Sequence, residues 1–271
     1  MSEPIFYFEG DDQEMNQAYE AARRSFKYFW RELSWERRRI VPALQLSAVK
    51  VPFTDGPRTD GNAEFEQMWL DEVDFDGDNV SGVLLNSPNW LTSVKQGDSA
   101  QVPFSRVTDW LMACRDRAYG GHTVNLMRSR MSARQRKAHD GAWGLDFGDP
   151  NEVKVELDPD IGNKPGLLSK LRGEGKSGSK SDGQAAFVDH PMCINMLPKI
   201  EEQLKEDRSI ANTTDERGWT LLHSEAMAGN FGVVKLLVHY GAKIGAKTPN
   251  GKVAAELARG IGWEELAAYL T

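Results

Sequence analysis

The sequence predicts an α+β fold in which an N-terminal helix packs on a twisted antiparallel sheet or partial barrel, followed by a small all-α module. Three observations support this prediction. A helical apolar pattern opens the chain, short β-like runs separated by turn residues follow it, and two short helical segments recur near the end with a 33-residue period. We expect a first domain over residues 1–155, a linker over 156–190 and the helical module over 191–271.

The first helix has a recognisable start and one apolar face. Asp11 stands at the N-cap position, and Glu14 three residues later completes a capping box. The apolar residues recur at steps of three and four: Met15, Tyr19, Ala22, Phe26, Phe29, Trp30 and Leu33. Such a stripe can bind a cofactor or a partner, but core packing is its usual cause. We therefore expect it to face the sheet.

The strands expected after this helix are short and joined by tight turns. Their positions are 44–53, 66–73, 80–85 and 100–104, and they are rich in β-branched and aromatic residues. Asp76-Gly77-Asp78 forms a hairpin turn between the second and the third. Strands joined in this way favour antiparallel pairing. A further helix is expected over 128–139, after the Gly120-Gly121 turn.

Gly, Lys and Ser dominate the segment from residue 158 to residue 186, where large apolar residues are rare. Such a composition cannot bury enough apolar surface to offset chain entropy. We therefore expect a flexible linker or a long surface loop across 156–190.

The internal repeat is clearest between residues 215 and 242. A shift of 33 residues places Gly218 on Gly251 and Leu237 on Leu270. With its T-x-L-H motif at 220–223, two short helices and a Gly turn, the segment resembles ankyrin repeats. It comprises a half repeat, one full repeat and a degenerate closing one. The pattern departs from the family at Leu221, where Pro is usual, and at Glu225, where a small residue is usual.

The ankyrin resemblance implies a non-catalytic protein that binds another protein. In ankyrin repeats the loop tips and the outward side of the first helix face partners. By motif these positions are Glu216, Arg217, Trp219, Met227, Ala228 and Tyr240. Trp, Tyr and Arg are the residue types that dominate binding energy at interfaces. The alternative for Trp219 is that it fills a gap against the adjacent turn, and His223 is expected to be structural.

The first 150 residues resemble a bacterial domain family of unknown function, the YegJ-like domains. The sequence segments that carry the resemblance occur in the same order as in that family. Among them are Phe29-Trp30, 48–53, 66–70, 82–88 and 120–123. This resemblance implies an α+β fold and no established activity. Ankyrin-tailed proteins of this kind also occur in bacteria as immunity partners of secreted toxins. A cytosolic immunity-type protein is therefore the most concrete form of the expected role.

Composition excludes several classes of function. The net charge of −7 argues against a general nucleic-acid binder, and no run of apolar residues is long enough to span a membrane. Cys114 and Cys193 lie far apart and form no CxxC pair, which favours reduced thiols in the cytoplasm. No histidine spacing indicates a metal site, and no cofactor is expected. The acidic stretch at Asp74 lacks the Gly and Glu that an EF-hand loop requires, so a hairpin is the better interpretation.

Two other functions remain open. One is a cryptic enzyme with a pocket near Trp69, Asn86, Asp109 and His122. The other is a regulator linked to nucleic acid through the arginine-rich helices. The basic residues that crowd the exit of the first helix and the acidic residues of 55–78 either neutralise each other as solvated faces or form a docking surface.

Overall fold

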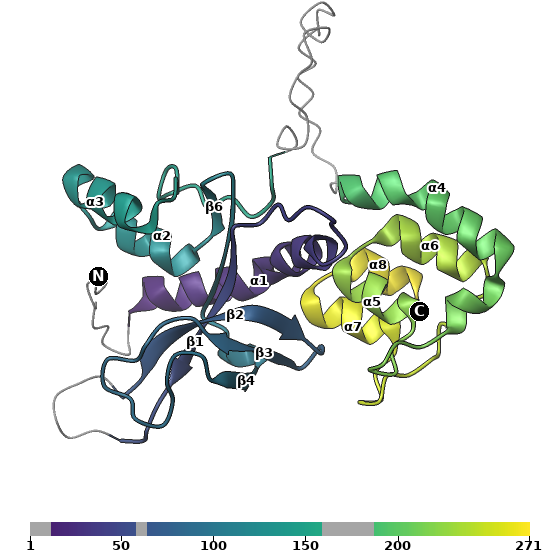
Figure 1. Cartoon of the computed structure of the whole chain (residues 1–271), viewed down its shortest axis with the longest axis horizontal. Coiled ribbons are helices and arrows are strands. Elements are labelled where there is room, and N and C mark those ends of the chain that lie inside the picture. Colours follow the sequence, from purple (N-terminus) through teal and green to yellow (C-terminus); the bar gives the residue numbers. More distant parts are fainter. Residues whose placement is uncertain (1–11, 58–63, 159–186) are drawn as a thin grey trace, which may run out of the picture.

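The computed structural model describes residues 12–57, 64–158 and 187–271. A sheet domain and a helical module lie on different sides of one long helix, α1 (Gln13–Glu36), whose C-terminal end reaches the module (Figure 1). The predicted fold class is confirmed. Of the two forms expected for the sheet, the open sheet is the one observed.

The sheet has six strands in the order β4-β3-β2-β1-β5-β6, and all neighbours are antiparallel. The strands are β1 (Leu46–Phe53), β2 (Glu66–Phe75), β3 (Asn79–Leu84), β4 (Ser99–Pro103), β5 (Asp109–Cys114) and β6 (Arg117–Gly120), with a short 3₁₀ turn, η1 (Phe104–Arg106), before β5. The first four match the predicted runs. The last two were not predicted, because every residue of β5 is buried and the alternation that marks a strand is absent.

One face of the sheet carries the main core, as predicted. Phe26, Phe29 and Trp30 of α1 are buried against it, and the N-cap is Asp12, one residue later than expected. The other face is partly covered by α2 (His122–Ser129) and α3 (Ala133–Trp143). The single helix predicted over 128–139 is therefore wrong. Helix α2 ends at Ser129, and Ser132 starts α3 by forming a capping box with Gln135.

The module follows the predicted ankyrin arrangement. The half repeat is α4 (Pro191–Glu206) with η4 (Arg208–Asn212), the full repeat is α5 (Leu221–Ala228) with α6 (Phe231–His239), and the closing repeat is α7 (Ala254–Ile261) with α8 (Glu264–Tyr269). Gly218 and Gly241 have φ of +75° and +91°, where a Cβ is disfavoured. His223 Nδ1 accepts from the backbone N–H of Thr220 at 3.0 Å, and its Nε2 lies 2.9 Å from the Ala246 carbonyl oxygen. The structural role predicted for His223 is confirmed.

The described ends of the predicted linker or surface loop are packed against the rest of the chain. Arg31 forms an ion pair with Glu156, and its Nη1 donates to the Val188 carbonyl oxygen at 3.2 Å. The Phe187 ring lies 5.1 Å from the Phe231 ring. The central part of the linker, 159–186, lies outside the described residues.

Candidate functional site

The predicted partner-binding residues divide into exposed and buried ones. Glu216 and Arg217 are exposed, as expected. The other four are buried, with exposed fractions of 5 % for Trp219, 1 % for Met227, 0 % for Ala228 and 9 % for Tyr240. The prediction that these four face outward is wrong.

The burial has identifiable causes. Helix α5, which carries Met227 and Ala228, packs against α1, α6 and α7. The Trp219 ring packs edge-on against His223, and the Tyr240 hydroxyl donates to Glu201 Oε1 at 3.3 Å. The gap-filling alternative for Trp219 fits this placement better than an exposed anchor does.

A closed ring of polar contacts joins α1 to the module. Trp35 Nε1 donates to Asn230 Oδ1 at 3.0 Å, and Asn230 Nδ2 donates to Glu225 Oε2 at 2.7 Å. Arg38 Nη2 donates to Glu225 Oε1 at 2.6 Å, and the Arg38 guanidinium lies 4.7 Å from the centroid of the Trp35 ring. We call these four residues the polar junction. It explains Glu225, which replaces the usual small residue: the N-terminal domain supplies its arginine.

A second contact lies one helical turn or more earlier on α1. Lys27 Nζ donates to the Gly262 carbonyl oxygen at 3.0 Å and lies 4.9 Å from the Trp263 ring. The buried Arg31 guanidinium lies 5.1 Å from the same ring. Burial lowers the pKa of Lys27. Of the two alternatives for the basic face of α1, a solvated face and a docking surface, the contacts of Lys27 and Arg31 with the module favour the second.

The loop tips of the module also contact the sheet domain. Arg217 and Arg37 both pair with Asp74, at 3.5 and 3.1 Å, and Lys252 pairs with Asp78 on the same β2–β3 hairpin. The acidic stretch is therefore a docking surface within the chain. Its basic partners come from α1 and from the module.

Glu32 forms a buried pair beside the polar junction. His190 N-caps α4 by accepting from Met192 N through Nδ1 at 3.1 Å, and its Nε2 lies 2.9 Å from Glu32 Oε2. Arg39 Nη2 lies 2.7 Å from Glu32 Oε1. Burial alone would raise the pKa of Glu32, but the hydrogen bond from His190 and the charge of Arg39 outweigh it and lower the pKa.

The polar residues among the four proposed for an enzyme pocket take part in hydrogen bonds within the fold. The buried Asp109 accepts from the backbone N–H groups of His122 and Thr123 at 2.9 and 2.8 Å, so it caps α2. His122 Nε2 instead lies 2.8 Å from Ser25 Oγ. Asn86 Oδ1 accepts from the backbone N–H of Trp69 at 3.0 Å. Each of these polar groups has a structural bonding partner.

The Ser25–His122 pair invites comparison with an activated nucleophile, but its hydrogen bonds argue against one. The Ser25 hydroxyl donates to the Ala21 carbonyl oxygen at 2.8 Å, and its oxygen accepts from Trp110 Nε1 at 3.1 Å. While the hydroxyl donates to the backbone in this way, its oxygen is left to accept from His122 Nε2. A general base would have to receive that proton instead. Burial also lowers the pKa of His122.

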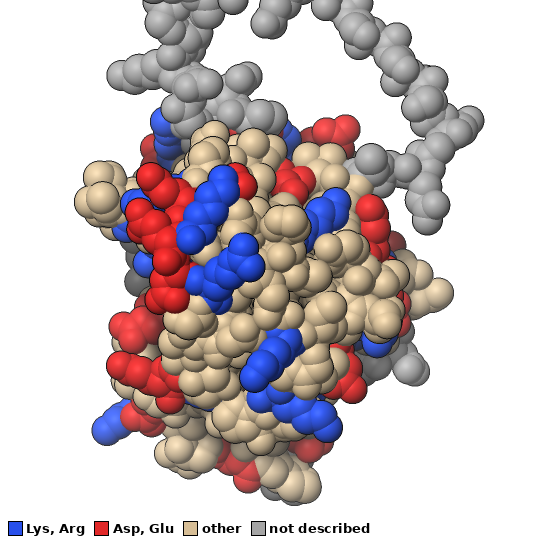
Figure 2. Space-filling model, turned by 90° about the vertical axis from the view of Figure 1, so that its right-hand side faces the viewer, with Lys and Arg blue, Asp and Glu red and all other residues tan. Residues whose placement is uncertain are grey.

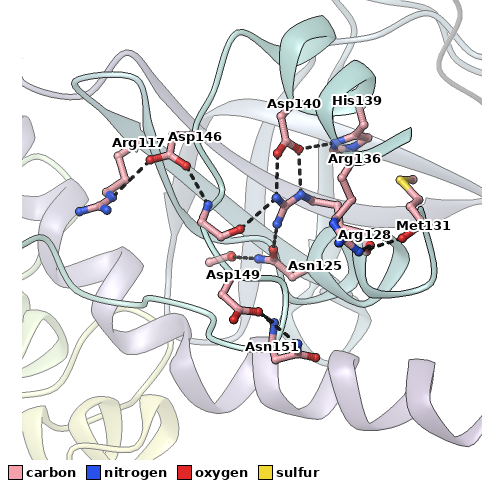
Figure 3. Close-up of polar contacts among 12 residues, drawn as sticks. Arg117, Asn125, Arg128, Met131, Arg136, His139, Asp140, Asp146, Asp149 and Asn151 are labelled. Carbon is pink, nitrogen blue, oxygen red and sulfur yellow. Dashed lines mark hydrogen bonds and ion pairs between the residues drawn. The ribbon is translucent and has the colours of Figure 1, made fainter. Parts of the chain in front are cut away.

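A buried arginine joins α2 to α3, and the sequence did not reveal it. Arg128 Nε and Nη2 donate to the two carboxylate oxygens of Asp140 at 2.8 and 2.7 Å, and Nη1 donates to Asn125 Oδ1 at 2.6 Å (Figure 3). Arg136 Nη1 donates to the Met131 carbonyl oxygen at 2.8 Å beside it. A shallow, open depression lies next to this cluster. Arg128 also lines this depression, but its guanidinium is hydrogen-bonded to Asp140, Asn125 and the Gly148 carbonyl oxygen.

Metal and membrane sites are not found in the described part of the chain. Across 12–57, 64–158 and 187–271, no three His, Cys, Asp or Glu residues gather as metal ligands would. The same ranges hold no helix with the length and apolarity needed to cross a bilayer. Asp76 accepts from the backbone N–H groups of Asp78 and Asn79, which is the geometry expected of a hairpin turn.

Comparison with known proteins places both parts of the chain. Residues 12–147, half of the chain, match a family model described as an uncharacterized protein conserved in bacteria, DUF2314. The chain belongs to the DUF2314 family. Residues 217–249 match the ankyrin repeat model. The DUF2314 match covers α1, the whole sheet, α2 and α3, and the ankyrin match covers α5 and α6.

Two relatives agree with this division. An ankyrin repeat protein of Neisseria meningitidis serogroup B is 39 % identical over 267 residues, which cover 98 % of this chain and 96 % of the relative. The uncharacterized protein YegJ of Escherichia coli K12 is 33 % identical over 78 residues, 29 % of this chain and 47 % of that protein. Both resemblances expected from the sequence are confirmed. The Neisseria protein spans both parts, so the fusion of domain and module is shared.

Proposed function

We propose that this chain is a non-catalytic protein that acts by binding another protein. The observation that carries the proposal is the ankyrin repeat at 217–249, because stacked ankyrin repeats present extended surfaces that recognise proteins. The structural roles of Asp109, His122 and Ser25 favour a non-catalytic role for the DUF2314 domain.

The charge on the module favours a protein over nucleic acid. Figure 2 shows the side of the molecule that the module forms, where Lys and Arg stand apart and Asp and Glu lie among them and toward the margins. Binding to a phosphate backbone needs a continuous basic surface. An interspersed surface with uncharged areas between is suited to a protein partner.

The most concrete form of the proposal is an immunity-type role in the cytoplasm, in which the chain neutralises a toxin. The architecture of the chain, a domain with an ankyrin tail, motivates it by analogy. The two free, buried cysteines are in keeping with a reducing compartment.

Affinity capture from the native bacterium, followed by calorimetry with the purified candidate, tests the binding role. We expect one protein to bind with a Kd in the micromolar range or below. Glu216→Lys, which reverses an exposed charge at a loop tip, should weaken binding by changing the surface alone. Glu152→Lys, at an exposed glutamate outside the module, serves as the matched charge reversal. If none of the captured proteins binds stoichiometrically in calorimetry, the proposal is refuted.

The immunity role has its own test. Expression of the toxin-like product of an adjacent gene should stop growth, and co-expression of this chain should restore it. Growth arrest that this chain does not relieve would leave the binding role standing and reject the immunity role for that gene pair.

A further inference from the structure

We infer that α1 and the module form an autoinhibitory contact, in which the DUF2314 domain occupies the ankyrin surface that a partner would use. The inference rests on the proposed function, since it concerns access to the same module. It sets a condition for binding: a protein that recognises helices α5 and α7 must first displace the C-terminal end of α1.

The contact covers the surface that matters for recognition. The first helices of the two C-terminal repeats, α5 and α7, both pack against α1. Both loop tips are engaged as well, Arg217 with Asp74 and Lys252 with Asp78. Helices and tips together make up the part of an ankyrin module that faces partners. Here α1 and the β2–β3 hairpin of the same chain cover that part.

The chemistry of the contact suits a surface that can open. Asn230 and Glu225 are buried in the closed arrangement, and each gains water when α1 leaves. Buried ion pairs add little net stability because desolvation offsets their attraction, although they select one arrangement strongly. Contacts between domains of one chain resemble transient interfaces and are more polar than permanent ones. The polar junction thus specifies the closed state, and the apolar contact that Trp35 makes is given up when that state opens.

The sequence supports a dedicated contact. Glu225 stands where ankyrin repeats usually carry a small residue, and it is 1 % exposed. A buried carboxylate at that position is costly unless a cation meets it, and Arg38 reaches it from a position 187 residues earlier. An external partner without an arginine at this point would leave Glu225 unpaired. Helix α1 therefore binds this surface more favourably than an external protein that lacks such an arginine.

Hydrogen exchange on the full chain tests whether the contact opens independently. Arg38→Glu places two carboxylates together, so amides of α5, α7 and the last turns of α1 should exchange at least tenfold faster. Amides of the sheet and of α6 should keep their rates. Adding Glu225→Arg restores an ion pair of reversed sense and should restore slow exchange. Arg24→Glu, on an exposed part of α1, is the matched control and should change nothing in the module.

Access to the surface is tested with a labelled synthetic peptide of residues 22–40 as the probe. The Arg38→Glu chain should bind this peptide at least tenfold more tightly than the wild-type chain, because the peptide supplies the displaced arginine. Equal peptide binding overturns the inference, as does exchange that accelerates equally in sheet and module, or that does not accelerate at all. Neither measurement needs the natural partner. Failure here would therefore leave the proposed binding role untouched.

Discussion

At the residue scale, Trp219 separates a scaffold role from a binding role. Its side chain is 5 % exposed and the Arg217 guanidinium lies 5.0 Å from its ring. Trp219→Ala should lower the free energy of unfolding by about 3 to 5 kcal/mol, the usual cost of removing a buried Trp. Arg217→Ala, at an exposed ion pair, should cost about 1 kcal/mol or less. Denaturant unfolding of both variants separates the scaffold role from the binding role. A Trp219→Ala chain as stable as the wild type would contradict the scaffold role.

Glu32 makes the stability of the chain depend on pH. Its folded pKa lies below the ordinary 4.5, so its pair with His190 and Arg39 contributes stability that is fully present above that pH. This stability is lost as the pH falls through the lower folded pKa. The free energy of unfolding of the wild type should therefore fall more steeply below pH 4.5 than that of Glu32→Gln, which cannot titrate. Parallel pH profiles for the two proteins would contradict the assignment.

At the scale of elements, the turn between α5 and α6 is fixed by a close contact. Gly229 has φ of +73°, and a Cβ there would lie 2.3 Å from the Trp263 ring. Gly241 has φ of +91° with nothing within 4 Å, so it isolates the cost of backbone strain. Gly229→Ala should cost about 1 to 3 kcal/mol more than Gly241→Ala, because only the first also overpacks the core. Equal thermal shifts in calorimetry would mean that Trp263 moves aside freely.

The elements that the sequence predicted are those with clear local patterns. The first helix, the first four strands and the repeat all show periodicity or turn residues that local physics explains. Strand β5 was missed because both of its faces are covered, so its residues do not alternate. The break between α2 and α3 left a recognisable mark, since Ser132 and Gln135 have the spacing of a capping box.

At the scale of the whole molecule, Arg31 connects three segments that are distant in the sequence. It binds Glu156 and the Val188 carbonyl oxygen and stacks near Trp263. Arg31→Lys keeps the charge but loses the planar fork that meets two acceptors at once. We expect a loss of about 1 to 3 kcal/mol of unfolding free energy, as for hydrogen bonds to a charged group, because Arg31 is buried but Glu156 is half exposed. Denaturant unfolding measures it, and a loss no larger than that of Arg24→Lys would contradict this role.

The junction itself could not be predicted from the sequence. Arg37, Arg38 and Arg39 look alike in the chain, yet they pair with Asp74, with Glu225, and with Glu32 and Glu36. Which acid each arginine meets depends on where the module docks, and no local pattern encodes that. The same fact explains why Met227 and Ala228 were expected on a free surface. An ankyrin motif specifies its own stack, but it does not specify what covers the stack.

A double-mutant cycle between Arg38 and Glu225 tests most directly whether the N-terminal domain docks on the inner face of the module. Glu225→Ala restores the small residue usual in ankyrin repeats, and Arg38→Ala removes the cation that reaches it from α1. Unfolding free energies of the wild type, both single variants and the double variant give the coupling energy. Docking as described predicts a favourable coupling of about 0.5 to 3 kcal/mol, as for residues in one hydrogen-bonded network. A coupling within about 0.3 kcal/mol of zero would mean that the two residues do not meet in solution.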